Sequence, residues 1–197
     1  MVKRLAATIT QYCISHNWIE CSKSQWCQYA AEKILGKLAF SWQCLLLGIL
    51  TGRFCEMIVF VLTFYAFRER MGGWHANHFW SCQILSVAIT VSAVIFFGPC
   101  LEGASLLFSV TINIIIVLLT CCSKPAYPVA VHFTAEIKYL NTKKKNRMLI
   151  GLVVFQIFTL IVCDSTIFVY SLLALAFTDF SVLLQYIKLQ KERMCET

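Results

Sequence analysis

Charged residues are scarce in this chain. Only 14% of its 197 residues are charged, and 59% are hydrophobic, whereas soluble domains have roughly a quarter charged and about half apolar residues. The mean hydropathy is +0.72. This composition argues against a soluble domain and places the apolar excess in lipid.

Several motifs of metal and disulfide chemistry are missing. The chain has no H-E-x-x-H pair of zinc ligands, and none of its 11 cysteines form a C-x-x-C pair. Most cysteines lie in apolar segments or on the inferred cytoplasmic face, where a free thiol behaves as a small apolar residue. We therefore predict reduced thiols rather than a disulfide framework. A cleavable signal peptide is not evident either, because no apolar core follows Lys3 and Arg4.

Long apolar runs fill most of the chain, at 39–67, 83–101, 104–122, 149–163 and 166–187. A spanning helix needs about 20 apolar residues, so the first run is too long for one helix, and Arg53 interrupts it. We read it as two antiparallel helices, about 36–51 and 54–69. The predicted fold class is therefore all-α, a polytopic membrane protein with about six transmembrane helices. Five spans plus a re-entrant hairpin is the alternative.

Proline and glycine mark the expected ends of two spans. Gly98-Pro99 is predicted to end the third span, and Glu102-Gly103 to start the fourth. After the fourth, Pro125 and Pro128 are predicted to break the chain, so that 123–147 forms a long loop ending in a Lys-rich run. This run is expected to contact anionic headgroups or to attract an acidic peptide.

The basic residues orient the protein. With six spans, all 17 Lys and Arg residues except Arg53 fall on one side of the membrane. Basic segments stay in the cytoplasm, so both termini, residues 68–82 and residues 123–147 are predicted to be cytoplasmic. Five spans would put basic clusters on both sides.

The N-terminal residues 1–35 differ from the rest, because apolar residues recur there at helical spacing among charged ones. This pattern predicts amphipathic helices on the inner leaflet, or helices covering the bundle. We therefore divide the chain into an amphipathic N-terminal helical region, 1–35, and a transmembrane bundle, 36–197. Gly48 and Gly52 form a G-x-x-x-G pattern, which predicts close helix packing within the chain or, alternatively, a homodimer contact.

Reactive side chains gather in the segment Arg68 to Cys82, RERMGGWHANHFWSC, between two apolar runs. A helix N-terminus and a neighbouring histidine favour the reactive thiolate of a cysteine. Histidine can take the thiol proton and later protonate a leaving amine. The segment, called the motif below, therefore predicts a thiol protease with Cys82 as nucleophile and His75 as base.

The spacing in the motif sets a geometric condition. A straight helix would hold the Cα atoms of His75 and Cys82 about 10 Å apart, at about 1.5 Å per residue, whereas a base must come within about 3 Å of its nucleophile. We therefore predict a bend or a folded-back loop, for which Gly72 and Gly73 supply freedom. Zinc bound by His75, His78 and Cys82 is the alternative, but there is no clear carboxylate ligand nearby, and we predict no cofactor.

The series Arg68 … Gly73-Trp74-His75-Ala76 … Cys82 resembles the signature of the accessory gene regulator B family of bacterial membrane peptidases. The chain is also similar to that family in its length, its amphipathic N-terminal region, its paired helices before the motif and its loop from Pro125-x-x-Pro128 into a Lys-rich stretch. The resemblance covers nearly all 197 residues.

The resemblance implies that Cys82 is the nucleophile, that His75 is its base and that Arg68 and Gly73 support them. It implies a short precursor peptide as partner, which is cut, held as an enzyme thioester and closed by an internal thiol or hydroxyl into a thiolactone or lactone for quorum sensing. The protein would be a multi-pass protein of the bacterial cell membrane with a cytoplasmic active site. Its partners would be the peptide and the bilayer, with no nucleic acid.

Several roles stay open. Asp179, Gln83 and Asn77 are candidates to orient His75. A carboxylate within an apolar span, such as Asp179, is costly and often functional, though pairing inside the bundle is the alternative. Arg68 is expected to bind peptide carboxylates or an oxyanion, or else to reach the headgroups.

A small transporter or a non-enzymatic partner subunit is the alternative function. It predicts polar residues along a path through the membrane, and the spans offer few beyond Asn113, Gln156 and Asp179.

Overall fold

The computed structural model describes residues 2–74, 79–127, 134–162 and 165–195, and most of these residues are helical. Among them are no strands, only one isolated backbone bridge between Gly72 and Ala126, so the all-α fold class is confirmed. The elements are α1 (Val2–Ser15), η1 (Cys21–Lys23), α2 (Ser24–Thr51), α3 (Phe54–Met71), α4 (Phe79–Ser92), the π-helical turn η2 (Ala93–Phe97), α5 (Gly98–Glu102), α6 (Leu106–Cys122), α7 (Ala135–Ile161) and α8 (Ser165–Cys195).

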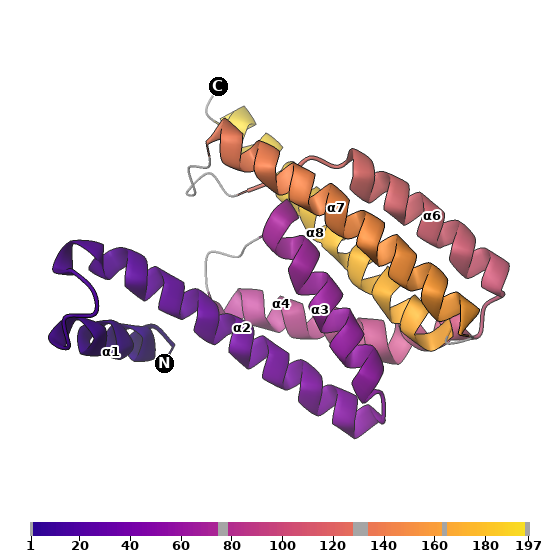
Figure 1. Ribbon diagram of the computed structural model, residues 1–197, viewed down its shortest axis with the longest axis horizontal. Coiled ribbons are helices and arrows are strands. Elements are labelled where there is room, and N and C mark those ends of the chain that lie inside the picture. The colour runs from indigo at the N-terminus through magenta and orange to yellow at the C-terminus, as the bar shows by residue number, and fades with distance from the viewer. Residues whose placement is uncertain (1, 75–78, 128–133, 163–164, 196–197) are drawn as a thin grey trace.

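Helix α8 is the centre of the bundle (Figure 1). All residues from 168 to 175 are buried, and because that stretch exceeds two helical turns, every side of the helix is covered there. Helices α3, α5, α6 and α7 all pack against it. The last helix of the chain therefore joins most of the others.

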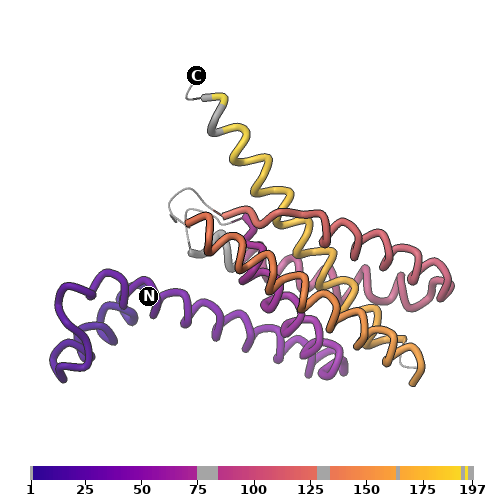
Figure 2. The backbone as a smooth tube through the Cα atoms, turned by 45° about the horizontal axis from the view of Figure 1, so that its top comes forward, coloured from indigo at the N-terminus to yellow at the C-terminus, as the bar shows by residue number. Residues whose placement is uncertain are grey.

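An arm formed by α1 and the first part of α2 projects from the bundle (Figure 2). Helix α1 packs on α2 and buries Ala6 and Thr10. The helix predicted at 36–51 begins earlier than expected. Helix α2 runs unbroken from Ser24 to Thr51. Its first turns hold Ala, Gln, Glu and Lys and no proline, so nothing ends the helix before residue 36.

The predicted turn at Arg53 is confirmed. Helix α2 ends at Thr51, and Gly52 follows it with a φ of +69°, a left-handed conformation that suits glycine. Gly48 approaches α3 so closely that a Cβ atom there would lie 3.0 Å from the Cβ of Met57. The predicted close packing of Gly48 within the chain is therefore confirmed as well.

The predicted end of the third span at Gly98-Pro99 is wrong. Helical structure continues from α4 through η2 and α5 to Glu102, and the next helix starts only at Leu106, where the Ser105 hydroxyl accepts a hydrogen bond from the amide of Phe108. A proline clashes with the carbonyl four residues earlier, here within η2. The wider π turn is a local adjustment that lets the helix carry this proline.

The predicted loop 123–147 is also too long. Helix α7 begins at Ala135, and the hydroxyl of Thr134 accepts a hydrogen bond from the amide of Ile137. Glu136 lies in the first turn, where its charge suits the helix dipole. The residues that follow are mostly good helix formers, so the Lys-rich run lies on a helix.

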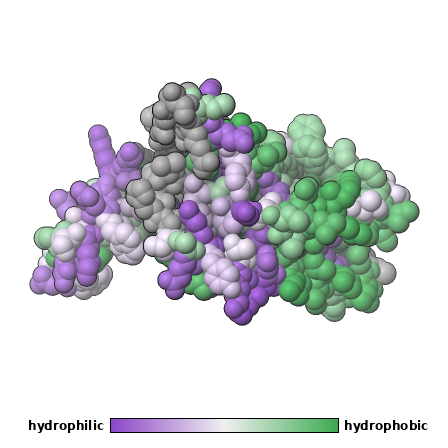
Figure 3. All heavy atoms as spheres, turned by 90° about the horizontal axis from the view of Figure 1, so that it is seen from above, coloured by the Kyte–Doolittle hydropathy of each residue, from purple (hydrophilic) through white to green (hydrophobic). Residues whose placement is uncertain are grey.

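Among the described residues, three helical stretches are long and apolar enough to cross a membrane, namely Cys21–Thr51, Ile84–Glu102 and Ser165–Lys191. Helix α6 is apolar but shorter. Figure 3 shows apolar residues covering the end of the molecule away from the arm, with polar residues gathered towards the arm. The chain is therefore a helical membrane protein.

Candidate active site

The first half of the motif, up to Trp74, is held by two distant parts of the chain. The amide of Gly73 donates to the carbonyl of Ala126 at 3.0 Å, and the amide of Trp74 donates to the carbonyl of Ser181 at 2.9 Å. Ala126 follows α6, and Ser181 lies in α8. These backbone bonds fix the direction in which the chain leaves α3.

Both glycines of the motif are required by this geometry. Gly72 has a φ of +76° and Gly73 a φ of +123°, values that other residues rarely adopt. A Cβ atom on Gly72 would lie 2.2 Å from the carbonyl oxygen of Ala126, and one on Gly73 would lie 2.7 Å from the Oγ of Ser181. The glycines therefore permit one tightly packed conformation.

Arg68 fastens the same segment. Its guanidinium donates to the Ser181 Oγ at 2.7 Å and to the Trp74 carbonyl at 2.8 Å. It also lies 5.4 Å from the centre of the Phe64 ring. The two predicted supporting residues, Arg68 and Gly73, thus meet at Ser181, which sequence analysis did not identify.

The second half of the motif returns as α4. The four residues between Trp74 and α4, which include His75, Asn77 and His78, lie outside the described residues. The side chains of Cys82 and Gln83 also lie outside them. The backbone places Cys82 as the fourth residue of α4, within its first turn. The approach of His75 to Cys82 stays a prediction.

Asp179 lies on a different side of α8 from Ser181, which contacts Gly73 and Trp74. Its Oδ2 accepts a hydrogen bond from the Thr120 hydroxyl at 2.6 Å, whereas its buried Oδ1 has no hydrogen-bond partner within the described ranges. Two residues along a helix correspond to a rotation of about 200°, so Asp179 and Ser181 point to nearly opposite sides of α8. Asp179 therefore pairs inside the bundle, between α8 and α6.

Lys145 is a second residue that sequence analysis missed. Its exposure is 0%, and its ammonium donates to the carbonyls of Thr120, Cys121 and Ser123 at 2.6, 3.1 and 2.7 Å. The expectation that the whole Lys-rich run contacts headgroups or peptide is wrong for this residue. Helical spacing from the buried Leu149 and Gln156 is the signal for its burial, but that signal needs the start of α7 to be known.

Other buried polar residues of the apolar helices bind one another. Asn113 donates to Gln156 at 3.0 Å, and Gln156 donates to the Ser171 hydroxyl at 2.9 Å. These bonds join α6, α7 and α8. Within the part of the chain that the structure describes, no cluster of three His, Cys, Asp or Glu residues is placed to hold a metal ion, and each cysteine whose side chain is described is free.

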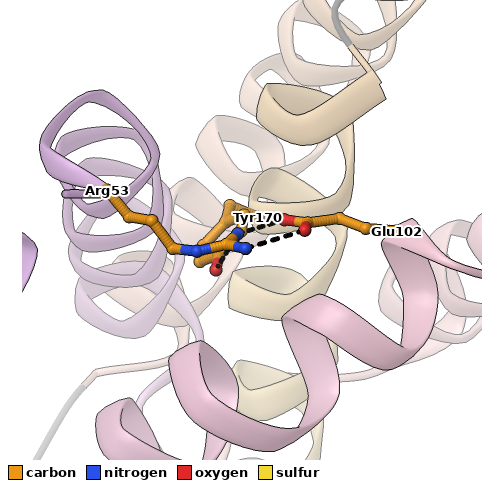
Figure 4. A network of polar contacts seen from close by, with 3 residues as sticks. All are labelled: Arg53, Glu102 and Tyr170. Carbon is orange, nitrogen blue, oxygen red and sulfur yellow. Dashed lines mark hydrogen bonds and ion pairs between the residues drawn. The ribbon is translucent and has the colours of Figure 1, made fainter. Parts of the chain in front are cut away.

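The opposite end of the bundle has one prominent polar cluster (Figure 4). Arg53 forms a bidentate ion pair with Glu102, with Nη2 2.9 Å from Oε2, and donates to the Tyr170 hydroxyl at 3.0 Å. The hydrogen bonds to Glu102 raise the pKa of Arg53. This cluster ties the α2–α3 turn to α5 and α8.

Comparison with known proteins adds one result. A family model described as accessory gene regulator B matches residues 3–189, which include the whole motif. A search of curated proteins and a search of solved structures found no match.

Proposed function

The chain belongs to the accessory gene regulator B family, which supports a role in processing quorum-sensing peptides, and we propose that it is a membrane-embedded cysteine endopeptidase that cyclises its product. Its substrate is a short precursor peptide. Cys82 is the proposed nucleophile and His75 the proposed base. Arg68 and Gly73 are proposed to support them by fixing the start of the motif.

The observation that carries this proposal is that hydrogen bonds hold the first half of the motif, up to Trp74, in one conformation. Gly73 and Trp74 are bound to Ala126 and Ser181, so the residue that follows, His75, starts from a rigid point. Helix α4 carries Cys82 in its first turn, where the helix dipole favours a thiolate. Catalytic pairs work when rigid elements hold their surroundings in place.

The proposed reaction has two acyl transfers. His75 takes the thiol proton, and the Cys82 thiolate attacks the carbonyl carbon of the scissile peptide bond. The C–N bond breaks, His75 protonates the leaving amine, and the precursor stays on Cys82 as a thioester. His75 then takes the proton of an internal thiol of the precursor, whose sulfur attacks the thioester carbon. The C–S bond to Cys82 breaks, which releases the thiolactone and leaves Cys82 as a thiolate beside protonated His75. A serine hydroxyl in place of that thiol gives a lactone.

No ATP is needed, because the thioester conserves the activation of the acyl group. Water must be kept from the thioester, and a position at the membrane boundary suits that need. The cut fragment leaves, which draws the reaction towards the ring. Holding the internal thiol close to the thioester supplies the effective concentration for closure.

We also propose a six-span topology with both termini and the motif in the cytoplasm, the spans being α2, α3, α4 to α5, α6, α7 and α8. The cluster of Arg53 and Glu102 gathers element ends at one side of the bundle. The hydrogen bonds of Ala126 with Met71 and Gly73 gather element ends at the other side. Since nearly all basic residues belong to the second side, that side is the cytoplasmic one.

The arm is proposed to lie on the inner leaflet. Trp18 and Trp26 are exposed at 68% and 74%, and tryptophan favours the membrane interface. On this proposal the N-terminal region 1–35 is a membrane-surface element, and residues 36–197 form the catalytic bundle, with α2 continuous between them.

The test of catalysis uses purified protein in lipid nanodiscs and its precursor peptide. Cys82→Ala and His75→Ala should each abolish cleavage, whereas Cys100→Ala, at an exposed free cysteine, should cleave normally. A precursor without its internal nucleophile should accumulate on Cys82 as an adduct that hydroxylamine removes, seen by mass spectrometry. Near-normal cleavage by Cys82→Ala would rule out the thiol mechanism, and cleavage without any adduct would indicate simple hydrolysis.

The topology has its own test. Reporter fusions after Lys124 and after Thr197 should both give a cytoplasmic signal, and a fusion after Gly52 should give an external one. An external signal after Lys124 would overturn both the six-span arrangement and the cytoplasmic site.

A further inference from the structure

We propose that Lys145 is a positioning residue for the motif, which it serves by fixing the end of α6. The proposal rests on the proposed function, because it takes the motif as the active site. Lys145 acts through backbone groups, so it is not a catalytic residue.

The surroundings of Lys145 use all of its donors. A lysine ammonium has three N–H groups and no acceptor, and here it donates to three carbonyl oxygens, those of Thr120, Cys121 and Ser123. The last four carbonyls of a helix have no partner within the helix, and α6 ends at Cys122. A cation at that place satisfies these carbonyls and suits the negative end of the helix dipole.

Lys145 and Asp179 bind the same residue of α6. The Thr120 hydroxyl donates to Asp179, and the Thr120 carbonyl accepts from Lys145. One residue of α6 thus contacts both the acid and the base. A buried charge needs such partners, and this arrangement explains how α7 carries a fully buried lysine.

Helix α7 binds both ends of the segment 123–127, which follows α6. Lys145 binds the carbonyl of Ser123, and Asn141, one turn earlier, donates to the Tyr127 hydroxyl at 2.8 Å. That hydroxyl donates to the carbonyl of Arg70. Burial raises the pKa of Tyr127, so the hydroxyl keeps its proton for this bond.

Ala126, which lies between Ser123 and Tyr127, also binds the motif through its backbone. Ala126 donates to the carbonyl of Met71 at 2.8 Å and accepts from the amide of Gly73 at 3.0 Å. Because three residues span at most about 10 Å, fixing Ser123 restricts where Ala126 lies. The position of Gly73, two residues before His75, therefore depends on Lys145.

The two preceding lysines offer matched controls. Lys143 and Lys144 are exposed, whereas Lys145 is buried, although the three residues are consecutive and identical. Replacing each in turn by methionine, which is similar in length and carries no donor, tests burial and hydrogen bonding with the same chemical change.

The experiment measures structure and reaction separately in nanodiscs. In Lys145→Met, amide hydrogen exchange at Gly73 and Ala126 should rise at least about tenfold, because hydrogen bonds to a charged group are among the stronger ones. The rate of adduct formation on Cys82 at saturating precursor should fall at least about tenfold, with little change in the precursor concentration that gives half the maximal rate. Lys143→Met and Lys144→Met should match the wild type in amide exchange and in the maximal rate of adduct formation.

Two further experiments test the role of Lys145 even when Lys145→Met does not fold. Lys145→Arg retains a charged donor group and should recover part of both losses. In the wild type, Lys145 should resist an amine-acetylating reagent that modifies Lys143 and Lys144.

Each contrary result has a distinct meaning. Unchanged exchange in Lys145→Met, or acetylation of Lys145 as fast as of Lys143, would overturn the anchor. Faster exchange with an unchanged adduct rate would overturn the positioning role. A wild type that forms no adduct would refute the proposed function, whereas the exchange and acetylation arms would still report on the anchor.

Discussion

The substitution Gly73→Ala puts the geometry of the motif to its most direct test. The φ of +123° at this position costs a residue with a side chain roughly 1–3 kcal/mol. The added Cβ would lie 2.7 Å from the Ser181 Oγ, so the hydroxyl has to move. Moving it weakens the hydrogen bond from Arg68, and a bond of this charged kind contributes about 1.5–3 kcal/mol.

Together these effects give a cost of about 2.5–6 kcal/mol. A loss of 2 kcal/mol in holding the motif corresponds to a rate lowered about 30-fold. We therefore expect Gly73→Ala to lower precursor cleavage by at least about 30-fold and to lower the thermal unfolding temperature in nanodiscs. Cleavage and unfolding should be measured on the same preparation.

Two comparisons separate the causes. Gly151→Ala is the control, because a Cβ there meets nothing within 4 Å and alanine favours a helix by about 0.5–1 kcal/mol. In the Gly73→Ala background, Ser181→Ala removes the closest contact, so the two changes together should cost less than their sum. Cleavage by Gly73→Ala within twofold of the wild type, at an unchanged unfolding temperature, would refute the reasoning.

Three further substitutions probe other contacts. Arg53→Gln breaks the ion pair with Glu102 and should lower the free energy of unfolding by about 1 kcal/mol, a modest value since both side chains are partly exposed. Lys23→Gln, in an ion pair that is mostly exposed, should change nothing measurable. Gln156→Leu removes the acceptor of the hydrogen bond from Asn113. It should lower the free energy of unfolding of the bundle by about 0.6–1.7 kcal/mol. Unfolding in mixed detergent micelles measures all three.

The outcomes that would contradict these expectations are specific. Equal stability of Arg53→Gln and Lys23→Gln would mean that the cluster around Arg53 does not contribute measurably to the stability of the bundle. A Gln156→Leu protein more stable than the wild type would mean that apolar packing outweighs the polar contact there. Ile157→Leu, at a side chain exposed by 53%, controls for placing a leucine on α7 where no polar contact is lost.

The sequence predicted those parts of the fold that depend on interactions between neighbouring residues. The turn at Arg53 follows from a charge beside Gly52, and the helical class follows from apolar runs of membrane length. The motif could be singled out in the same way, because its residues are close in sequence, and its catalytic role stays a prediction. These features need only neighbouring residues for their interpretation.

The contacts that fix the motif depend on distant parts of the chain, so they were not predictable. Arg68 binds Ser181, 113 residues later, and no pattern in either segment indicates that pairing. The burial of Lys145 depended on where α7 starts, which the two prolines of the preceding segment obscured. The third span was misjudged because a π turn absorbs Pro99, and that adjustment leaves no clear signature in sequence.

The contact between Trp74 and Ser181 also sets an order for biosynthesis. The two residues are 107 positions apart, and ribosomes add roughly 5–20 residues per second, so the partner of Trp74 emerges roughly 5–20 s later. Until then the newly made chain carries the motif without the helix that holds it. A chain truncated before α8 would likewise enter the membrane with every residue of the motif and none of its contacts to the last helix.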